Sequence, residues 1–232
     1  MSADEHLRLF AHLLGRHEAS LDLGRAALLL AEPEYPSLDI PASLLELDTL
    51  AAEARLKLGY TPSLEALSGW LHDEAGFHGN RDDYYDARNS FLNEVLVRRT
   101  GIPISLAVIH MEVARRLEVT AEGVSFPGHF LVRGDGKVYI DPFTGRACTA
   151  VDLRRLYARA TGQDRTPDES AYELAGKTQI LLRMLNNLRG IYAAANDGPR
   201  LRLCLDRVQI LTTAQKSAPK AGAPRRPVIR SN

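Results

Sequence analysis

Three residues with the side chains of an acyl-transfer triad follow one another in the middle of the chain: Ser105, His129 and Asp141. In such a site the serine hydroxyl attacks a carbonyl carbon, the histidine removes its proton, and the carboxylate orients the imidazole ring. Each residue also has an ordinary interpretation. A serine in a first helical turn satisfies a backbone N–H, a histidine can be structural, and Asp-Pro begins turns. The functional interpretation therefore requires that folding brings the three side chains together.

The region around the histidine and the aspartate has the pattern of a β-hairpin. Two runs, GHFLVR at 128–133 and KVYIDPF at 137–143, flank Gly134-Asp135-Gly136. Alternation of apolar and polar residues on both sides of a glycine-containing loop predicts two antiparallel strands. The apolar face is expected to comprise Phe130, Val132, Val138 and Ile140, and the opposite face His129, Leu131, Tyr139 and Asp141.

The loop type decides whether His129 meets Asp141, because the midpoint of their positions is Asp135. A three-residue loop 134–136, with Gly136 in the left-handed conformation, would place His129 directly opposite Asp141. A two-residue loop would place them on opposite faces of the hairpin. The sequence favours the three-residue loop, centred on Asp135.

Ser105 lies in the first turn of a helix predicted over residues 103–119, which Pro103 begins. A helix N-terminus carries partial positive charge and free N–H groups, and it lowers the pKa of a cysteine thiol. A serine gains far less, because its hydroxyl stays protonated near neutral pH. Ser105 would therefore need His129 as a hydrogen-bonded base.

Polar residues before this helix offer further hydrogen bonds. Asn89, Ser90 and Asn93 lie largely on one side of a helix that begins near Asp86. We expect Asn89 and Ser90 to tie the polar loop at 78–86, since Asn and Ser commonly bond nearby backbone. For Asn93 two roles stay open, the same loop contact or donation to an oxyanion.

Helices are predicted on both sides of this region. Apolar spacing, proline starts and glycine ends predict helices over 3–17, 21–31, 41–59 and 62–76, and then over 151–160, 170–193 and 199–213. The loop 161–169 is polar. The last stretch, 214–232, is rich in Lys and Arg and contains no acidic residue from Lys216 onward, which predicts a disordered basic tail.

The composition narrows the classes of function. Lys+Arg and Asp+Glu both number 29, so the formal net charge is zero and no nucleic-acid or membrane partner is expected. Two cysteines, Cys148 and Cys204, do not make a disulfide framework, and no apolar run approaches a membrane span. The N-terminus carries charges throughout and lacks a signal-peptide pattern. We expect a cytoplasmic protein.

No cofactor or metal ion is expected. His72, Asp73 and His78 form a loose group, but metal sites need three or four convergent ligands. The acidic loop 77–86 lacks the spacing of an EF-hand and is expected to form a lid or a cleft wall.

Residues 77–145 resemble a known family. The segments GNRDDYYDARNSFLNEVLVRRTGIPISLAVIHMEVARR, EGVSFPGHFLVR and YIDPFTG are similar to the transglutaminase-like core of bacterial proteins named as regulators of sirC expression. The resemblance implies an α+β, papain-like transglutaminase core between helical N-terminal and C-terminal segments. By position, Ser105 stands where transglutaminases hold the cysteine, and His129 and Asp141 stand at the other two triad positions.

The resemblance also implies how the chain is divided. We expect an N-terminal helical segment at 1–76, the core at 77–150, a tetratricopeptide-like helical segment at 151–213 and the tail at 214–232. Two functions follow. The missing cysteine favours a non-catalytic regulatory module that binds another protein through the cleft or the C-terminal helices. The alternative is a Ser-His-Asp hydrolase or acyltransferase acting on an amide or ester.

Overall fold

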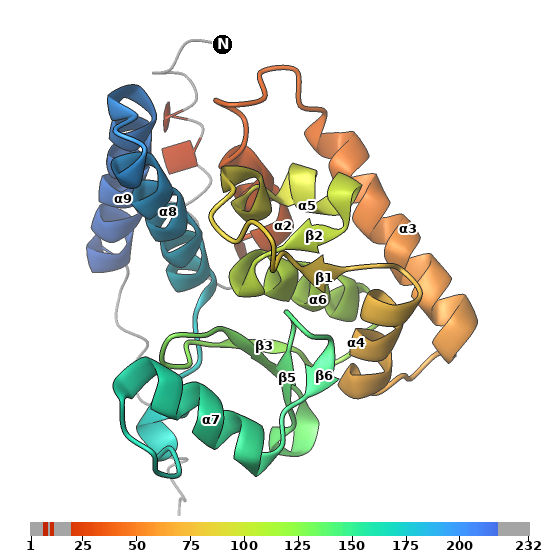
Figure 1. Ribbon diagram of the computed structural model, residues 1–232. Helices are drawn as coiled ribbons and strands as arrows, with labels where there is room; N and C mark the ends of the chain where they lie inside the picture. Colours follow the sequence, from red (N-terminus) through yellow and green to blue (C-terminus); the bar gives the residue numbers. More distant parts are fainter. Residues whose placement is uncertain (1–6, 9, 12–19, 218–232) are drawn as a thin grey trace, which may run out of the picture.

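A computed structural model describes residues 7–8, 10–11 and 20–217. Figure 1 shows α6 in the centre of the molecule, with α3 on one side and the pair α8 and α9 on the other. The larger of the two sheets lies below α6, and α7 lies below that sheet. The structure contains the α-helices α2 (Leu23–Leu29), α3 (Ile40–Leu58), α4 (Leu64–Asp73), α5 (Leu92–Arg98), α6 (Pro103–Arg116), α7 (Ala150–Thr161), α8 (Lys177–Ala194) and α9 (Gly198–Ser217).

Two small sheets complete the fold, which confirms the predicted α+β class. One is a parallel pair, β1 (His78–Gly79) and β2 (Thr100–Gly101). The other is antiparallel, with strands in the order β3 (Glu122–Val124), β4 (Leu131–Arg133), β5 (Tyr139–Asp141) and β6 (Arg146–Ala147). Single-turn helices η2 (Ala87–Ser90), η3 (Asp135–Lys137) and η4 (Glu169–Tyr172) lie in the connections.

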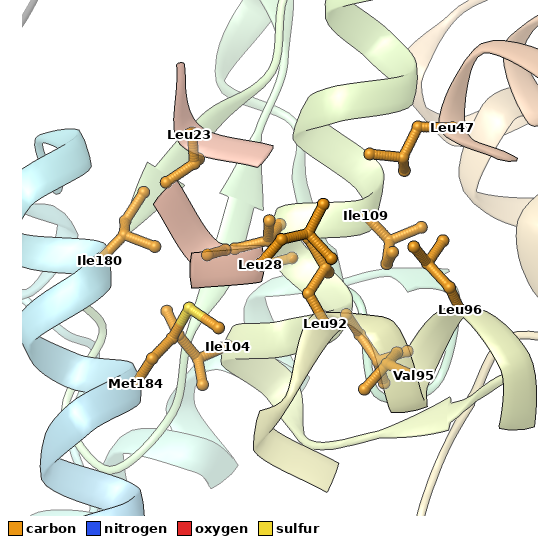
Figure 2. Packing of buried hydrophobic residues seen from close by; sticks show 14 of the residues in the cluster. Leu23, Leu28, Leu47, Leu92, Val95, Leu96, Ile104, Ile109, Ile180 and Met184 are labelled. Carbon is orange, nitrogen blue, oxygen red and sulfur yellow. The ribbon is translucent and has the colours of Figure 1, made fainter. Parts of the chain in front are cut away.

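The main hydrophobic core joins helices from both ends of the chain. Figure 2 shows Leu28 of α2, Leu92 of α5, Ile104 of α6 and Met184 of α8 packed in one cluster. Most of α6 is buried, which its apolar N-terminal half predicts. The predicted C-terminal helix pair is docked on the core, since α8 alone buries Thr178, Ile180, Leu181, Met184, Leu185, Leu188 and Tyr192. In the described part of the chain, no helix is long and apolar enough to cross a bilayer.

The faces of the hairpin agree with the sequence prediction. Val132 and Ile140 pack into the main core, and Leu131 packs with Leu153 and Tyr157 of α7 in a second, smaller cluster. The four-stranded sheet is therefore covered by α6 on one face and by α7 on the other. This arrangement explains why both faces of β4 are apolar.

The predicted register of the hairpin is wrong by two residues. β4 pairs Arg133 with Tyr139, so the loop is centred on Gly136 and not on Asp135. The loop comprises 135–137, and Gly134 N–H donates to Val138 O at 2.9 Å. Gly136 has the expected positive φ of 66°, but Lys137 also has a φ of 60°. A second left-handed residue lets the chain turn one position later than the glycine pattern alone indicates.

Several boundaries also differ from the predictions. Helix α4 begins at Leu64 and not at Pro62, because the Ser63 side chain caps it by accepting from Ala66 N–H. Strands β1, β2, β3 and β6 were not predicted, since two or three residues show no alternation. Helix α9 continues to Ser217, into the stretch predicted as tail. The rest of that tail and most of the helix predicted over 3–17 lie outside the described residues.

Candidate functional site

His129 and Asp141 form a hydrogen-bonded pair. His129 lies in the turn before β4, and Asp141 is the last residue of β5. The His129 Nε2 atom lies 2.8 Å from Asp141 Oδ1, and both side chains are about 13–14% exposed. The same carboxylate oxygen accepts the Phe143 backbone N–H at 2.9 Å, which fixes its direction. The pair therefore has the arrangement in which a carboxylate orients an imidazole.

The pair forms in spite of the shifted register, because a shift of two positions keeps both side chains on the same face. In the observed register Leu131, two positions after His129, lies opposite Asp141, so the contact runs diagonally from the turn before the strand. Arg183 of α8 holds that turn. Its guanidinium donates to His129 O at 2.7 Å and lies 5.4 Å from the centre of the Phe130 ring.

Ser105 does not meet this pair. The residue is fully buried, and its Oγ lies 2.6 Å from Asn89 O and 3.1 Å from Ile102 O, while Ile102 N–H donates to Oγ at 3.1 Å. A hydroxyl has one proton to donate, and the shorter distance directs it to the Asn89 carbonyl. Ser105 therefore ties η2 to the start of α6. A catalytic role for the three residues stays a prediction.

Pro103 is the residue of the α6 N-terminus that faces His129 and Asp141, since all three line one cavity. Successive residues of an α-helix are rotated by about 100°, so Ser105 lies about 200° around the axis from Pro103. If the first position faces the cavity, the third position faces the core. This geometry separates the serine from the histidine.

The cavity beside the His–Asp pair has a volume of about 800 Å³. This lies within the range of about 300–1,000 Å³ that is typical of ligand sites. Its walls come from the loop after β1, the start of α6, the hairpin and α7. The lining residues are Asn80, Arg81, Tyr84, Pro103, Gly128, His129, Asp141, Phe143, Thr144, Arg155, Leu156, Arg159 and Ala160. The loop 77–86 is therefore a cleft wall, as the sequence predicts.

Asn89 ties the loop 80–86, as expected. Its amide nitrogen donates to Asp83 O at 2.7 Å and to Tyr84 O at 3.3 Å, and its oxygen accepts from Asn80 Nδ2 at 3.1 Å. Ser90 is fully buried, and its hydroxyl has no hydrogen-bond partner in the described part of the chain. The oxygen of Asn93 is likewise buried and unpaired there, and Asn93 does not line the cavity.

The histidine and aspartate residues near the end of α4 have local partners. His72 Nδ1 lies 2.9 Å from Asp73 Oδ1. The Asp73 carboxylate also accepts hydrogen bonds from both terminal nitrogens of Arg146, each at 3.0 Å. His78 Nδ1 lies 2.8 Å from Gly76 O. Among the described residues no three His, Cys, Asp or Glu side chains gather closely enough to hold a metal ion.

Neither native cysteine has the properties of a reactive thiol. Burial, with the nearby negative charge of Asp141, raises the pKa of Cys148 to about 12. Burial raises the pKa of Cys204 to about 11, although the charge of Arg207 acts in the opposite direction. Both thiols stay protonated near neutral pH, so neither supplies the thiolate that a transglutaminase-type reaction needs.

Replacing Gly79 by alanine is expected to distort the cleft wall. A Cβ atom at this position would lie 2.2–2.3 Å from three ring atoms of Phe143, and Gly79 N–H donates to Phe143 O at 3.0 Å. Neither strand nor ring can move without breaking a contact, so unfolding by urea should show a loss of about 1–3 kcal/mol. Gly69→Ala is the control, because nothing lies within 4 Å of its added Cβ in helix α4. That change should stabilise the protein by up to about 1 kcal/mol. Equal effects of the two substitutions would contradict the expected contact.

Comparison with known proteins agrees with this architecture. A family model described as the transglutaminase-like superfamily matches residues 42–186. A UPF0162 protein of Xylella fastidiosa strain 9a5c is 40% identical over 225 residues, which cover 91% of this chain and 79% of that protein. A UPF0162 protein of Pseudomonas aeruginosa is 36% identical over 179 residues, 75% of this chain and 66% of that protein.

A eukaryotic protein also matches. The human F-box only protein 21 is 35% identical over 171 residues, which cover 64% of this chain and 26% of that protein. No solved structure matches the chain significantly. The likeness to regulators of sirC expression and the tetratricopeptide-like character of residues 151–213 stay predictions from the sequence. The family match extends over the helices before and after the sheet, and the chain therefore belongs to the transglutaminase-like superfamily, with the UPF0162 proteins among its homologues.

Proposed function

We propose that this protein is a non-catalytic, regulatory member of its superfamily and that its cleft binds a segment of another protein. One observation carries the proposal. The helix that begins at the cleft presents Pro103 there, which has no nucleophilic atom, while the hydroxyl of Ser105 is buried and bonded to Asn89 O. Serine in place of the family's cysteine would then serve the fold, since it links two segments of the core.

The cleft is the better of the two partner surfaces suggested by the sequence. It is open, it has a volume of about 800 Å³, and it contains the His129–Asp141 pair. The inner face of α8 is used for core packing. The match to about a quarter of the F-box protein supports a module that serves inside a larger protein.

The alternative is a hydrolase or acyltransferase that acts on an amide or ester. The observation that favours it is the His129–Asp141 pair on the cleft wall, because an oriented imidazole is a general base. Under that function Ser105 would have to leave its buried hydrogen bonds before it could attack a substrate.

A serine-directed fluorophosphonate probe separates the two functions. We expect no labelling between about pH 6 and pH 9, because the Ser105 hydroxyl is buried and donates to a backbone carbonyl. Ser105→Ala should instead lower the free energy of unfolding by about 1–3 kcal/mol, because the Ile102 N–H and the Asn89 carbonyl lose their partner. Labelling that disappears in Ser105→Ala would overturn the proposal.

Site-specific photo-crosslinking tests where the partner binds. A photoreactive residue placed at Leu156, which lines the cleft, should capture a specific protein that mass spectrometry identifies. The matched control is the same residue at Leu205 on α9, which is 45% exposed. Capture from the position on α9 and not from the cleft would move the binding site to the C-terminal helices.

A further inference from the structure

We propose that the cleft binds an extended acidic segment of its protein partner, whose carboxylates pair with Arg81, Arg155 and Arg159. This inference rests on the proposed function, because it names the chemistry of the segment that the cleft would hold. The amino-acid composition does not suggest an acidic ligand, since the formal net charge of the chain is zero.

The three arginines converge on the cavity from two walls. Arg155 and Arg159 are four positions apart on α7, so they lie on the same face of that helix. Arg81 belongs to the loop after β1, on another wall of the same cavity. Guanidinium groups bind carboxylates through paired hydrogen bonds, so this arrangement favours a ligand with more than one carboxylate.

These guanidinium groups are poorly neutralised by the protein itself. Within the described residues, Arg81 and Arg159 have no carboxylate within 4.0 Å, and Arg155 lies 3.9 Å from Asp152. By contrast Arg154, on another face of α7, bonds Asp164 at 2.8 Å. Asp141 is the acidic residue that lines the cavity, and it is bonded to His129. The cavity therefore has a positive potential that attracts anions.

An apolar surface lies between the arginines. Pro103, Tyr84, Phe143 and Leu156 line the cavity, and the Tyr84 and Phe143 rings are 6.2 Å apart at their centres. Arg81 lies over the Phe143 ring, 6.0 Å from its centre. A site with both properties fits a peptide in which acidic residues flank an apolar one.

The cleft continues beyond the His129–Asp141 pair into a second cavity. This length favours an extended ligand over a small anion. A second cavity of about 320 Å³ shares Asp141, Thr144, Arg155 and Leu156 with the first. It is also lined by Asp152 and by Arg146 and Ala147 of β6, the strand at the edge of the sheet, and Arg146 is paired with Asp73. An edge strand has free backbone groups that an extended peptide can pair with.

Fluorescence anisotropy with synthetic peptides tests the inference on the full chain. The probe is a short fluorescein-labelled peptide in which glutamates flank a central leucine, and the comparison peptide has lysine in place of each glutamate. We expect the glutamate peptide to bind at least about tenfold more tightly than the lysine peptide, and added salt to weaken its binding. The double change Arg155→Ala with Arg159→Ala should weaken binding by at least about tenfold.

The control variant is Arg154→Ala, which removes an arginine of the same helix that is paired outside the cavity. It should bind the glutamate peptide like the unaltered protein. Equal binding of both peptides, or equal binding by the double variant and the control, would overturn the inference. Displacement of the peptide by inorganic phosphate at similar concentration would also overturn it, in favour of a small-anion site. Turnover of an amide or ester by the protein would instead overturn the proposed function.

Discussion

Replacing Pro103 by cysteine is expected to produce a thiol that reacts with iodoacetamide, at about pH 6.5, at least about tenfold faster than an ordinary exposed thiol. Residue 103 is the first of α6, and its side chain is buried in the wall of the cavity that His129 also lines. A helix N-terminus and a nearby imidazolium both stabilise a thiolate. An unperturbed thiol, with a pKa of about 8.5, is only about 1% ionised at that pH.

The controls for this experiment lie in the same chain. Ser105→Cys introduces a thiol two positions further along the helix, where the native side chain bonds Asn89 O and does not line the cavity, and it should react slowly. The native thiols give a low background, because burial raises the pKa of Cys148 to about 12 and that of Cys204 to about 11. Adding His129→Ala to Pro103→Cys should return the rate toward that of an ordinary thiol. A rate at 103 no greater than that at 105 would show that the first turn of α6 faces away from the cleft.

Acidification is expected to destabilise the protein through His110. This side chain is buried in α6, where Nδ1–H donates to Leu106 O at 2.8 Å and Nε2 lies 3.0 Å from Ser68 Oγ. Burial lowers the pKa of His110 to about 4, although the Leu106 hydrogen bond and the charge of Asp141 act in the opposite direction. The unfolded chain, with a histidine pKa of about 6.5, binds this proton first.

This difference in pKa between the folded and unfolded states sets how the free energy of unfolding changes with pH. Between about pH 6.5 and pH 4 the unfolded state holds more protons, so the free energy of unfolding falls as the pH falls. The full effect is on the order of 3 kcal/mol, and all of this stability is present above about pH 6.5. Urea unfolding at a series of pH values measures it.

Two histidine variants isolate this contribution. His110→Gln should be less stable at neutral pH but should lose this part of the pH dependence. His72→Gln, at a ring that contacts Asp73 near the surface, should keep it. Parallel stability profiles for the unaltered protein and His110→Gln would show that another group causes the acid sensitivity.

The helices of the core follow from local chemistry that can be read in the sequence. Asp39 caps α3, Gly59 ends it with a φ of 86°, and Pro103 begins α6. The sequence also predicts that His129 and Asp141 lie on the same face of the hairpin. A register shift of two residues does not change this, because side chains alternate between the faces with a period of two. The sequence therefore predicted which side chains share a face of the hairpin, but it did not predict which residues pair across the two strands.

The two features on which the proposed function and the further inference rest depended on tertiary packing. The amphipathic pattern of a helix start does not say which side faces a cleft. In the structure Ser105 bonds Asn89 O, and Pro103, which is itself buried, lines the cavity. The positive charge of the cleft arises because Arg81 and the α7 arginines, 74 and 78 positions further along the sequence, line one cavity. The sequence by itself thus determined the helices and the His–Asp face, since capping and periodicity are local. The direction of Ser105 and the charge of the cleft were decided by contacts between distant segments, and no local pattern encodes those.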